Sequence, residues 1–424
     1  MFRKSQIKVV TIFALILFAI CAQSIQAQIR FRPGIEFPHN DLRPQGSDQS
    51  TGQLAAVARY SEHLDVFWAG NNWEVGSNWW NVGLNNANWN QVFSLSNSTP
   101  ARLGAILSVV SPLPERMEVY WIGEDGAVQM ALFNGQWNPP VAITPGGTSR
   151  PGSSVVALAR DAYHREVFWV NYNNDIEGTA RDDSQNDGQW VAPFIVTQDI
   201  PRAASLSAIA PDGYHIEIYF ADFQGRINLV KGDGTNGWQN PQAITVGHAT
   251  HPGAPVSVVA RTTAHRDVFW VEDNMSNFPS NQNGEGRIFG TWRNDFYRGG
   301  QWSAPYVVPN TGALHYARAY FYAGLSVIAP ESELVEIYFG DDVGRINRVW
   351  WDGASGWHGP QEVTSFMQAA IYSPVTALAR RFDHRDVFFI TPDGRVENAW
   401  WHKGVSNDRW NPLIPISAPN TITY

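Results

Sequence analysis

Paired tryptophans recur in the chain at a fixed distance from an acidic residue. Trp79-Trp80, Trp350-Trp351 and Trp400-Trp401 stand 14 and 15 residues after an acid. Trp292 matches the first tryptophan of each pair in the fifth unit. Neighbouring side chains on a strand point to opposite sides, so one indole can pack in a core while the other faces a groove. An exposed indole offers a flat face to a sugar ring and an N–H donor. We therefore expect these tryptophans to bind carbohydrate; core packing is the alternative role for at least one of each pair.

Histidines recur just before the same acids. His63, His265 and His384 each precede their acid by two residues, and we include them in the expected sugar contact. His164 and His215 hold the same position. Five imidazoles in separate repeats are too far apart to share one metal ion, whose ligands all lie about 2 Å from it. No metal or other cofactor is therefore expected, and loop-closing hydrogen bonds are the alternative role for these histidines.

Arginine precedes the acid by six residues in four of the repeats. A tight hairpin with this spacing can place the two charges opposite each other as a cross-strand pair. We interpret the pairs as structural salt links, because catalysis rarely needs four copies. The arginines are Arg59, Arg160, Arg261 and Arg380.

The acids belong to a motif of one acid, one β-branched residue and two aromatics that recurs seven times. A later tryptophan opens a short apolar run in each copy. Repeats of about 50 residues are typical of stacked supersecondary units. The acids are Asp65, Glu118, Glu166, Glu217, Asp267, Glu336 and Asp386, and the later tryptophans are Trp89, Trp137, Trp190, Trp238, Trp302, Trp357 and Trp410.

Each unit has the pattern of four short strands, rich in β-branched and aromatic residues and separated by Gly and Asn or Asp turns. Seven such units predict an all-β fold, a seven-bladed β-propeller of four-stranded antiparallel blades. The fourth strands are expected over runs such as Trp137–Thr144 and Trp410–Ser417, so the ring closes without an N-terminal strand. Within a propeller of residues 51–424, the units are predicted at about 54–104, 105–153, 154–204, 205–254, 255–324, 325–373 and 374–418.

The fifth unit contains two insertions. One covers residues 274–285 and is polar and rich in Gly and Asn; the other covers 311–322 and is rich in aromatics. Both are expected on the same face of the ring. Long loops in compact folds are often functional, so a lid, a partner surface and a plain elaboration all stay open.

The first 27 residues have the pattern of a secretory signal. Arg3, Lys4 and Lys8 precede an apolar run that is too short to span a bilayer comfortably. Residues 28–50 are expected to form an N-terminal arm. We predict a secreted or periplasmic protein without an integral membrane span after cleavage; an uncleaved anchor is the alternative.

Charge excludes one class of partner. The formal net charge is -9, and cleavage after Ala27 would lower it to about -12 by removing three basic residues. The chain also contains no basic cluster. Simple electrostatic binding of nucleic acid is therefore not expected.

Two stretches carry a resemblance to a known family. His265-Arg266-Asp267-Val268-Phe269-Trp270, and Asp386 to Val396 together with Trp400-Trp401, resemble the repeats of bacterial seven-bladed propeller lectins of the Photorhabdus lectin type. The resemblance covers about residues 50–417. It implies fucose or O-methylated sugars bound in several pockets between blades. Aleuria-type fucose lectins are similar only in architecture: they have six blades and an Arg/Glu clamp, whereas here an acid holds the first clamp position and Asn398 the second.

The sequence therefore predicts an exported, multivalent lectin with glycans or glycoconjugates as its partners. We favour a binding protein over an enzyme, because no Ser-x-Asp-x-Gly-x-x-Trp, Gly-x-Ser-x-Gly or His-Glu-x-x-His motif occurs. One alternative is a propeller glycoside hydrolase or lyase with a single site at the channel mouth. Another is a protein-interaction scaffold that uses the two insertions. The oligomeric state is not predicted.

Overall fold

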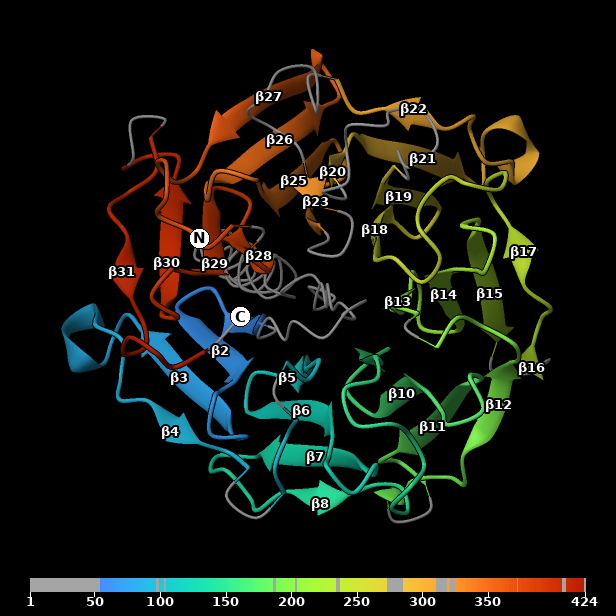
Figure 1. Ribbon diagram of the computed structural model, residues 1–424, viewed down its shortest axis with the longest axis horizontal. Coiled ribbons are helices and arrows are strands. Elements are labelled where there is room, and N and C mark those ends of the chain that lie inside the picture. Colours follow the sequence, from blue (N-terminus) through green and yellow to red (C-terminus); the bar gives the residue numbers. More distant parts are fainter. Residues whose placement is uncertain are drawn as a thin grey trace, which may run out of the picture. The chain divides into compact units, whose positions relative to one another are not determined.

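The computed structural model describes residues 54–422 except 97–98, 103, 186–187, 203, 234–236, 273–284, 310–318, 321–324, 372 and 406–408. The chain divides into two compact units, Met1–Glu36 and Phe37–Tyr424, and the described residues all belong to the second. In that unit seven antiparallel sheets of four or five strands surround an axis (Figure 1), which confirms the predicted seven-bladed propeller. The predicted signal 1–27 and arm 28–50 lie outside the described residues.

The first strand of each blade lies nearest the axis (Figure 1). Its residues are small or β-branched and largely buried, because neighbouring blades crowd together there. These inner strands are β1 (Leu54–Tyr60), β5 (Ser108–Leu113), β9 (Val155–Ala159), β13 (Ser207–Ile209), β18 (Val256–Thr262), β24 (Ser326–Glu331) and β28 (Val375–Arg381).

The second strand of each blade carries the acid and the aromatics, and the third carries the paired tryptophans where they occur. The second strands are β2 (His63–Ala69), β6 (Arg116–Ile122), β10 (His164–Val170), β14 (His215–Ala221), β19 (His265–Val271), β25 (Leu334–Gly340) and β29 (His384–Ile390). The third strands are β3 (Val75–Asn81), β7 (Val128–Phe133), β11 (Ile176–Asp182), β15 (Ile227–Asp233), β21 (Ile288–Asn294), β26 (Ile346–Asp352) and β30 (Val396–His402).

The outer strands are mostly shorter than the sequence predicts. Within Trp137–Thr144 only two residues form a strand, because Pro139 and Pro140 have no N–H to donate to a neighbouring strand. Asn411-Pro412 has the same effect in the last blade. The outer strands are β4 (Phe93–Ser94), β8 (Val141–Ala142), β12 (Phe194–Thr197), β16 (Gly237–Trp238), β17 (Gln242–Ala243), β22 (Tyr306–Val307), β27 (Gly356–Glu362) and β31 (Ile414–Pro415).

An edge-to-face aromatic pair joins every blade to the next. The later tryptophan of one blade meets the second-strand aromatic of the blade before it, with ring centroids 5.3–6.2 Å apart and ring planes at 80–88°. Such pairs stabilise by about 0.5–1.5 kcal/mol beyond their buried area. The pair Trp89–Phe388 and the contact between β1 and β28 close the ring, and the four described strands of the last blade all come from its own unit.

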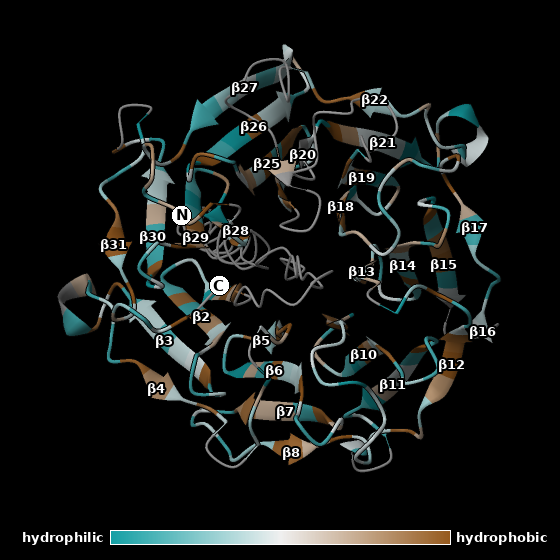
Figure 2. Ribbon diagram, viewed as in Figure 1, coloured by the Kyte–Doolittle hydropathy of each residue, from teal (hydrophilic) through white to brown (hydrophobic). Residues whose placement is uncertain are grey.

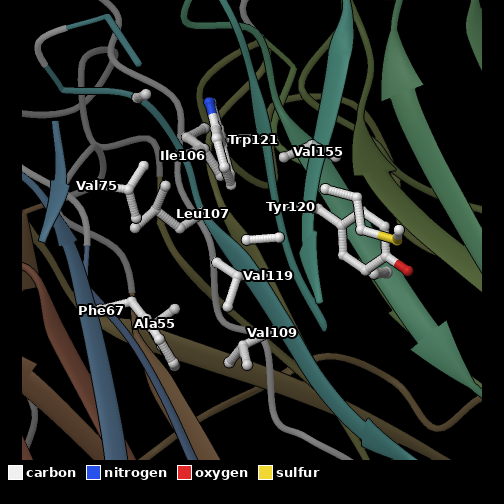
Figure 3. Close-up of a cluster of buried hydrophobic side chains, with 14 of the residues drawn as sticks. Ala55, Phe67, Val75, Ile106, Leu107, Val109, Val119, Tyr120, Trp121 and Val155 are labelled. Carbon is white, nitrogen blue, oxygen red and sulfur yellow. The ribbon is translucent and has the colours of Figure 1, made fainter. Parts of the chain in front are cut away.

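The apolar core is continuous across blade boundaries. In one cluster Phe67 of the first blade packs with Val109 and Val119 of the second and with Val155 of the third (Figure 3). Hydrophilic residues are found on many of the connecting loops (Figure 2). The described ends of the two insertions pair with each other as β20 (Glu285–Gly286) and β23 (Ala319–Tyr320).

Candidate functional site

A cluster of arginine, histidine and acid lies where the first hairpin of blades 1, 3, 5 and 7 turns. In blade 5, Arg261 Nε donates to Asp267 Oδ2 at 2.7 Å, and the guanidinium also contacts His265 Nε2. Arg59–Asp65, Arg160–Glu166 and Arg380–Asp386 form the same ion pair at 2.9, 2.7 and 2.6 Å. The predicted cross-strand pairs are therefore present. We call the face of the ring that carries these turns the near face.

Each of these arginines also reaches the next blade. Nη1 of Arg261 donates to the carbonyl oxygen of Ser332 at 3.1 Å, in the first turn of blade 6. Arg59, Arg160 and Arg380 donate in the same way to the carbonyl oxygens of Pro114, Gly213 and Ser61. The cluster therefore lies at the boundary between two blades. We call such a boundary a seam and name it by its two blades, so that this one is seam 5/6.

The two tryptophan positions of a blade face two different seams, one on each side of the blade. In seam 5/6, Trp292 from blade 5 stacks on His265 with centroids 5.5 Å apart, while Trp351 from blade 6 lies under Arg261, 4.5 Å from the guanidinium carbon. The third-strand residue opposite the acid, such as Trp292 opposite Asp267, thus faces the following blade, and the residue after it faces the preceding blade. Successive side chains of a strand point to opposite faces of its sheet, and in a propeller these faces meet the two neighbouring blades.

These side chains line a near-face pocket of about 460 Å³ in seam 5/6. Its aromatic lining includes Trp292, Tyr306 and Trp351, and its polar floor is Arg261, His265 and Asp267. Glu333 adds an exposed carboxylate from the first turn of blade 6. The pocket thus joins flat apolar walls to donors and acceptors, which is the general composition of a small-ligand site.

Two further seams repeat the arrangement. In seam 7/1, Trp400 stacks on His384 at 5.7 Å, and Trp80 lies 4.5 Å from the guanidinium carbon of Arg380. In seam 1/2, Trp79 stacks on His63 at 5.4 Å, and Phe133 takes the place of a second indole under Arg59. Glu62 and Glu115 hold the turn position of Glu333 in these seams and are exposed. We call these three glutamates the mouth carboxylates. We call seams 7/1, 1/2 and 5/6 the aromatic seams.

Seam 3/4 keeps the polar cluster but loses both aromatic walls. The two wall positions hold Ala180 and Gly232, and the ring of Trp238 covers Gly232, where an added Cβ would lie only 2.8 Å from it. Tyr214 replaces the mouth glutamate. His164 bonds to Asp161 at 2.7 Å, a partner that the other three clusters lack at this position. This seam therefore differs from the aromatic seams at both wall positions and at the turn.

The remaining three seams are sealed by buried ion pairs between blades. Glu336 of blade 6 accepts from Arg385 of blade 7 at 2.9 Å, from Arg348 at 2.7 Å and from the hydroxyl of Tyr338. In seams 2/3 and 4/5 the pairs are Glu118–Arg165, at 3.5 Å, and Glu217–Arg266, at 3.2 Å. Their acids bond to Tyr120 and Tyr219 in the same way. These seams are structural joints.

The residue just before the acid decides which kind of seam forms. It is arginine in blades 3, 5 and 7, where it pairs with the acid of the preceding blade. Blades with the arginine–histidine–acid cluster alternate with blades that lack it. Because the number of blades is odd, two cluster-bearing blades must be neighbours once. They meet at seam 7/1, where blade 1 carries the buried Leu64 in place of the sealing arginine.

The structure separates Trp350 and Trp401 from the other expected sugar contacts. Both face sealed seam 6/7, where Arg348 lies 4.5 Å from the Trp350 ring and Arg385 lies 5.9 Å from the Trp401 ring. The other eight expected residues all belong to the aromatic seams. Sequence reasoning missed Phe133 and the mouth carboxylates Glu62, Glu115 and Glu333. The sequence signal for these glutamates is a glutamate three residues before the acid, which occurs in units 1, 2 and 6.

His384 gives seam 7/1 a predictable pH response. Burial, and then the charge of Arg380, lower the pKa of His384 to about 3, so the ring is neutral near pH 7. The unfolded chain takes up this proton near the ordinary pKa of about 6.5. The free energy of unfolding should therefore fall as pH drops from about 6.5 towards 3. Above about pH 6.5 His384 is neutral in both states, and no stability is lost. Chemical denaturation at about pH 7 and about pH 4 measures this effect. Between the two pH values, H384N should lose less free energy of unfolding than the wild type, and equal losses would contradict this assignment.

Two general features concern the described part of the chain. No helix there is long and apolar enough to cross a membrane. No three His, Cys, Asp or Glu side chains in that part gather in a way that could hold a metal ion.

Comparison with known proteins places the fold. No protein-family model matches the chain, and no curated protein matches it. The BP39L lectin from Burkholderia pseudomallei is similar with a TM-score of 0.72 at 19% identity, over 87% of this chain and 100% of that one. AofleA from Arthrobotrys oligospora is similar with a TM-score of 0.51 at 14% identity, over 91% and 96% of the two chains. The expected resemblance to a bacterial lectin is confirmed for the fold, whereas the Photorhabdus type itself stays a prediction.

Proposed function

We propose that this protein is an exported, multivalent lectin whose sugar sites are the aromatic seams. The observation that carries the proposal is the threefold repetition of one side-chain arrangement on the near face. In each copy an arginine, a histidine and an aspartate meet two aromatic walls at a blade boundary. In the sealed seams, by contrast, buried ion pairs join the two blades.

The chemistry of the pocket suits a neutral sugar. The C–H face of a pyranose stacks on an indole, and its hydroxyls can donate to the mouth carboxylate. A deoxy-methyl or O-methyl group adds apolar area against the walls, which supports fucose and O-methylated sugars as ligands. The similarity to a Burkholderia lectin supports the same class of function. The secretory pattern of residues 1–27 supports export to the periplasm or the medium.

Titration with methyl α-L-fucoside and with 3-O-methyl-D-glucose tests this function. The expected result is weak binding of at least one sugar, with at least three sites per chain, and much tighter retention on a surface that displays many copies. Analysis of the recovered glycan should show no cleavage product. Absence of binding across a glycan array, or turnover of a bound glycan, would overturn the proposal.

A further inference from the structure

A second pocket opens on the face of the ring opposite the near face. It has a volume of about 440 Å³ and lies at the other end of strand β2 from His63. The turn of Asn71, Asn72 and Glu74 forms one part of its lining. Strand β4 and residues 420–421, which follow the last blade, form the rest. The pocket therefore marks the place where the two ends of the ring meet.

Gly76 gives the indole of Trp68 room to lie against strand β3 beside this pocket. Gly76 pairs with Trp68 across strands β2 and β3. An added Cβ at Gly76 would lie 2.5 Å from Trp68 Nε1, so no larger side chain fits without moving the ring. The other six blades carry a side chain at this register position: Gln129, Glu177, Asn228, Phe289, Asn347 and Glu397.

The indole N–H of Trp68 lacks the partner that its counterparts have. Trp121 and Trp270 donate to backbone carbonyls at 3.2 and 3.0 Å, and Trp169 donates to Glu177 at 3.2 Å. Among the described residues Trp68 has no such acceptor, although it is only 1% exposed and lines the pocket. The carbonyl oxygen of Thr421, another residue of the pocket lining, accepts from the N–H of Asn71.

Ser94 adds a second unused polar atom. Its Oγ is buried and has no hydrogen-bond partner among the described residues, and the residue lines the same pocket. Glu74 supplies a carboxylate whose Oε2 accepts from Asn72 at 2.7 Å. Buried polar atoms without partners are costly, which makes a ligand or an ordered water their natural complement. Phe93 gives the pocket an apolar side.

We propose that this pocket binds one neutral pyranose, and that the protein therefore carries a sugar site on each face of its ring. The Trp68 N–H and the Ser94 hydroxyl would donate to ring or hydroxyl oxygens, while Glu74 would accept from a sugar hydroxyl. The carboxylate disfavours anionic ligands, and the outward N–H edge of the indole disfavours cations. The choice of a sugar among neutral polyols rests on the proposed function; the site itself does not use the aromatic seams.

A seam-free variant isolates this site. In the triple variant W79A/W292A/W400A, titration with methyl glycosides of galactose, glucose, mannose and fucose should still show one site for at least one of them. The Trp68 indole N–H signal in a proton–nitrogen spectrum, assigned with W68F, should shift on binding. Adding E74Q and S94A should weaken this binding by about 10-fold or more, while E74Q/S94A alone leaves the seam sites intact.

The outcomes separate the two proposals. Loss of all binding in the triple variant, or an unmoved Trp68 signal, would overturn the second site and leave the seam function standing. Stronger binding of methyl glucuronide than of the neutral sugars would overturn the ligand class. Unchanged affinity after E74Q/S94A in the triple variant would overturn the assigned contacts. Thermal unfolding of each variant shows whether the fold is kept.

Discussion

The triple variant W79A/W292A/W400A should lose most of its retention on immobilised glycans while keeping its fold. Each replacement removes the wall that the cluster-bearing blade contributes to its own aromatic seam. A stacked sugar face covers on the order of 100 Å² of indole, which contributes about 2 kcal/mol. That loss weakens each site by roughly 30-fold. Because retention on a glycan surface depends on several sites at once, the effect on retention is larger than at any single site.

Trp350 provides the matched control. It occupies the same strand position as the three replaced residues, but it faces the sealed seam 6/7 and stacks near Arg348. W350A should therefore leave glycan retention close to that of the wild type. Equal losses in W350A and in any one of the single variants W79A, W292A or W400A would contradict the division into aromatic and sealed seams.

R385A should be among the most destabilising single changes in the ring. Arg385 is 2% exposed, and the glutamate that it joins, Glu336, is 0% exposed. Burial alone would raise the pKa of Glu336, but Arg348 and Arg385 together lower it below its usual value, so the carboxylate is charged. Removing one partner leaves this buried charge undercompensated, at a cost of about 3–5 kcal/mol. Chemical denaturation measures the loss.

An exposed ion pair is the control for this second prediction. Arg395 bonds to Asp393 at 2.8 Å near the surface, where such pairs contribute about 0–1 kcal/mol. R395A should therefore unfold close to the wild type. R385A should also keep its sugar binding, because seam 6/7 carries none in this account. If R385A were no less stable than R395A, the sealed seams would not be the joints of the ring.

The fold could be predicted from sequence because every blade repeats the same requirements. A period of about 50 residues, an acid followed by aromatics and a later tryptophan are all visible in one dimension. The pairing of Arg261 with Asp267 was also predictable, since a spacing of six residues matches a tight hairpin. The outer strands were predicted too long, because prolines such as Pro139 and Pro140 interrupt their pairing.

The division of the site among seams could not be predicted in the same way. The tryptophan pairs are alike in sequence, yet Trp350 and Trp401 face a joint while Trp80 and Trp351 face aromatic seams. The difference depends on the residue opposite the second tryptophan on the neighbouring strand, which is Leu64 for Trp80 and Arg385 for Trp401. Arg385 meets its partner Glu336, in the preceding blade, only in the closed ring. The pocket beside Trp68 has the same origin, because residues 420–421, which follow the last blade, complete its lining.

A crystal structure after soaking with methyl α-L-fucoside and 3-O-methyl-D-glucose tests the central claim most directly. The account predicts sugar density on the near face in seams 7/1, 1/2 and 5/6, against Trp400, Trp79 and Trp292. It predicts none in seams 2/3, 4/5 and 6/7, where ion pairs fill the space between blades. Sugar bound in a sealed seam, or three empty aromatic seams beside sugar bound elsewhere on the near face, would contradict it.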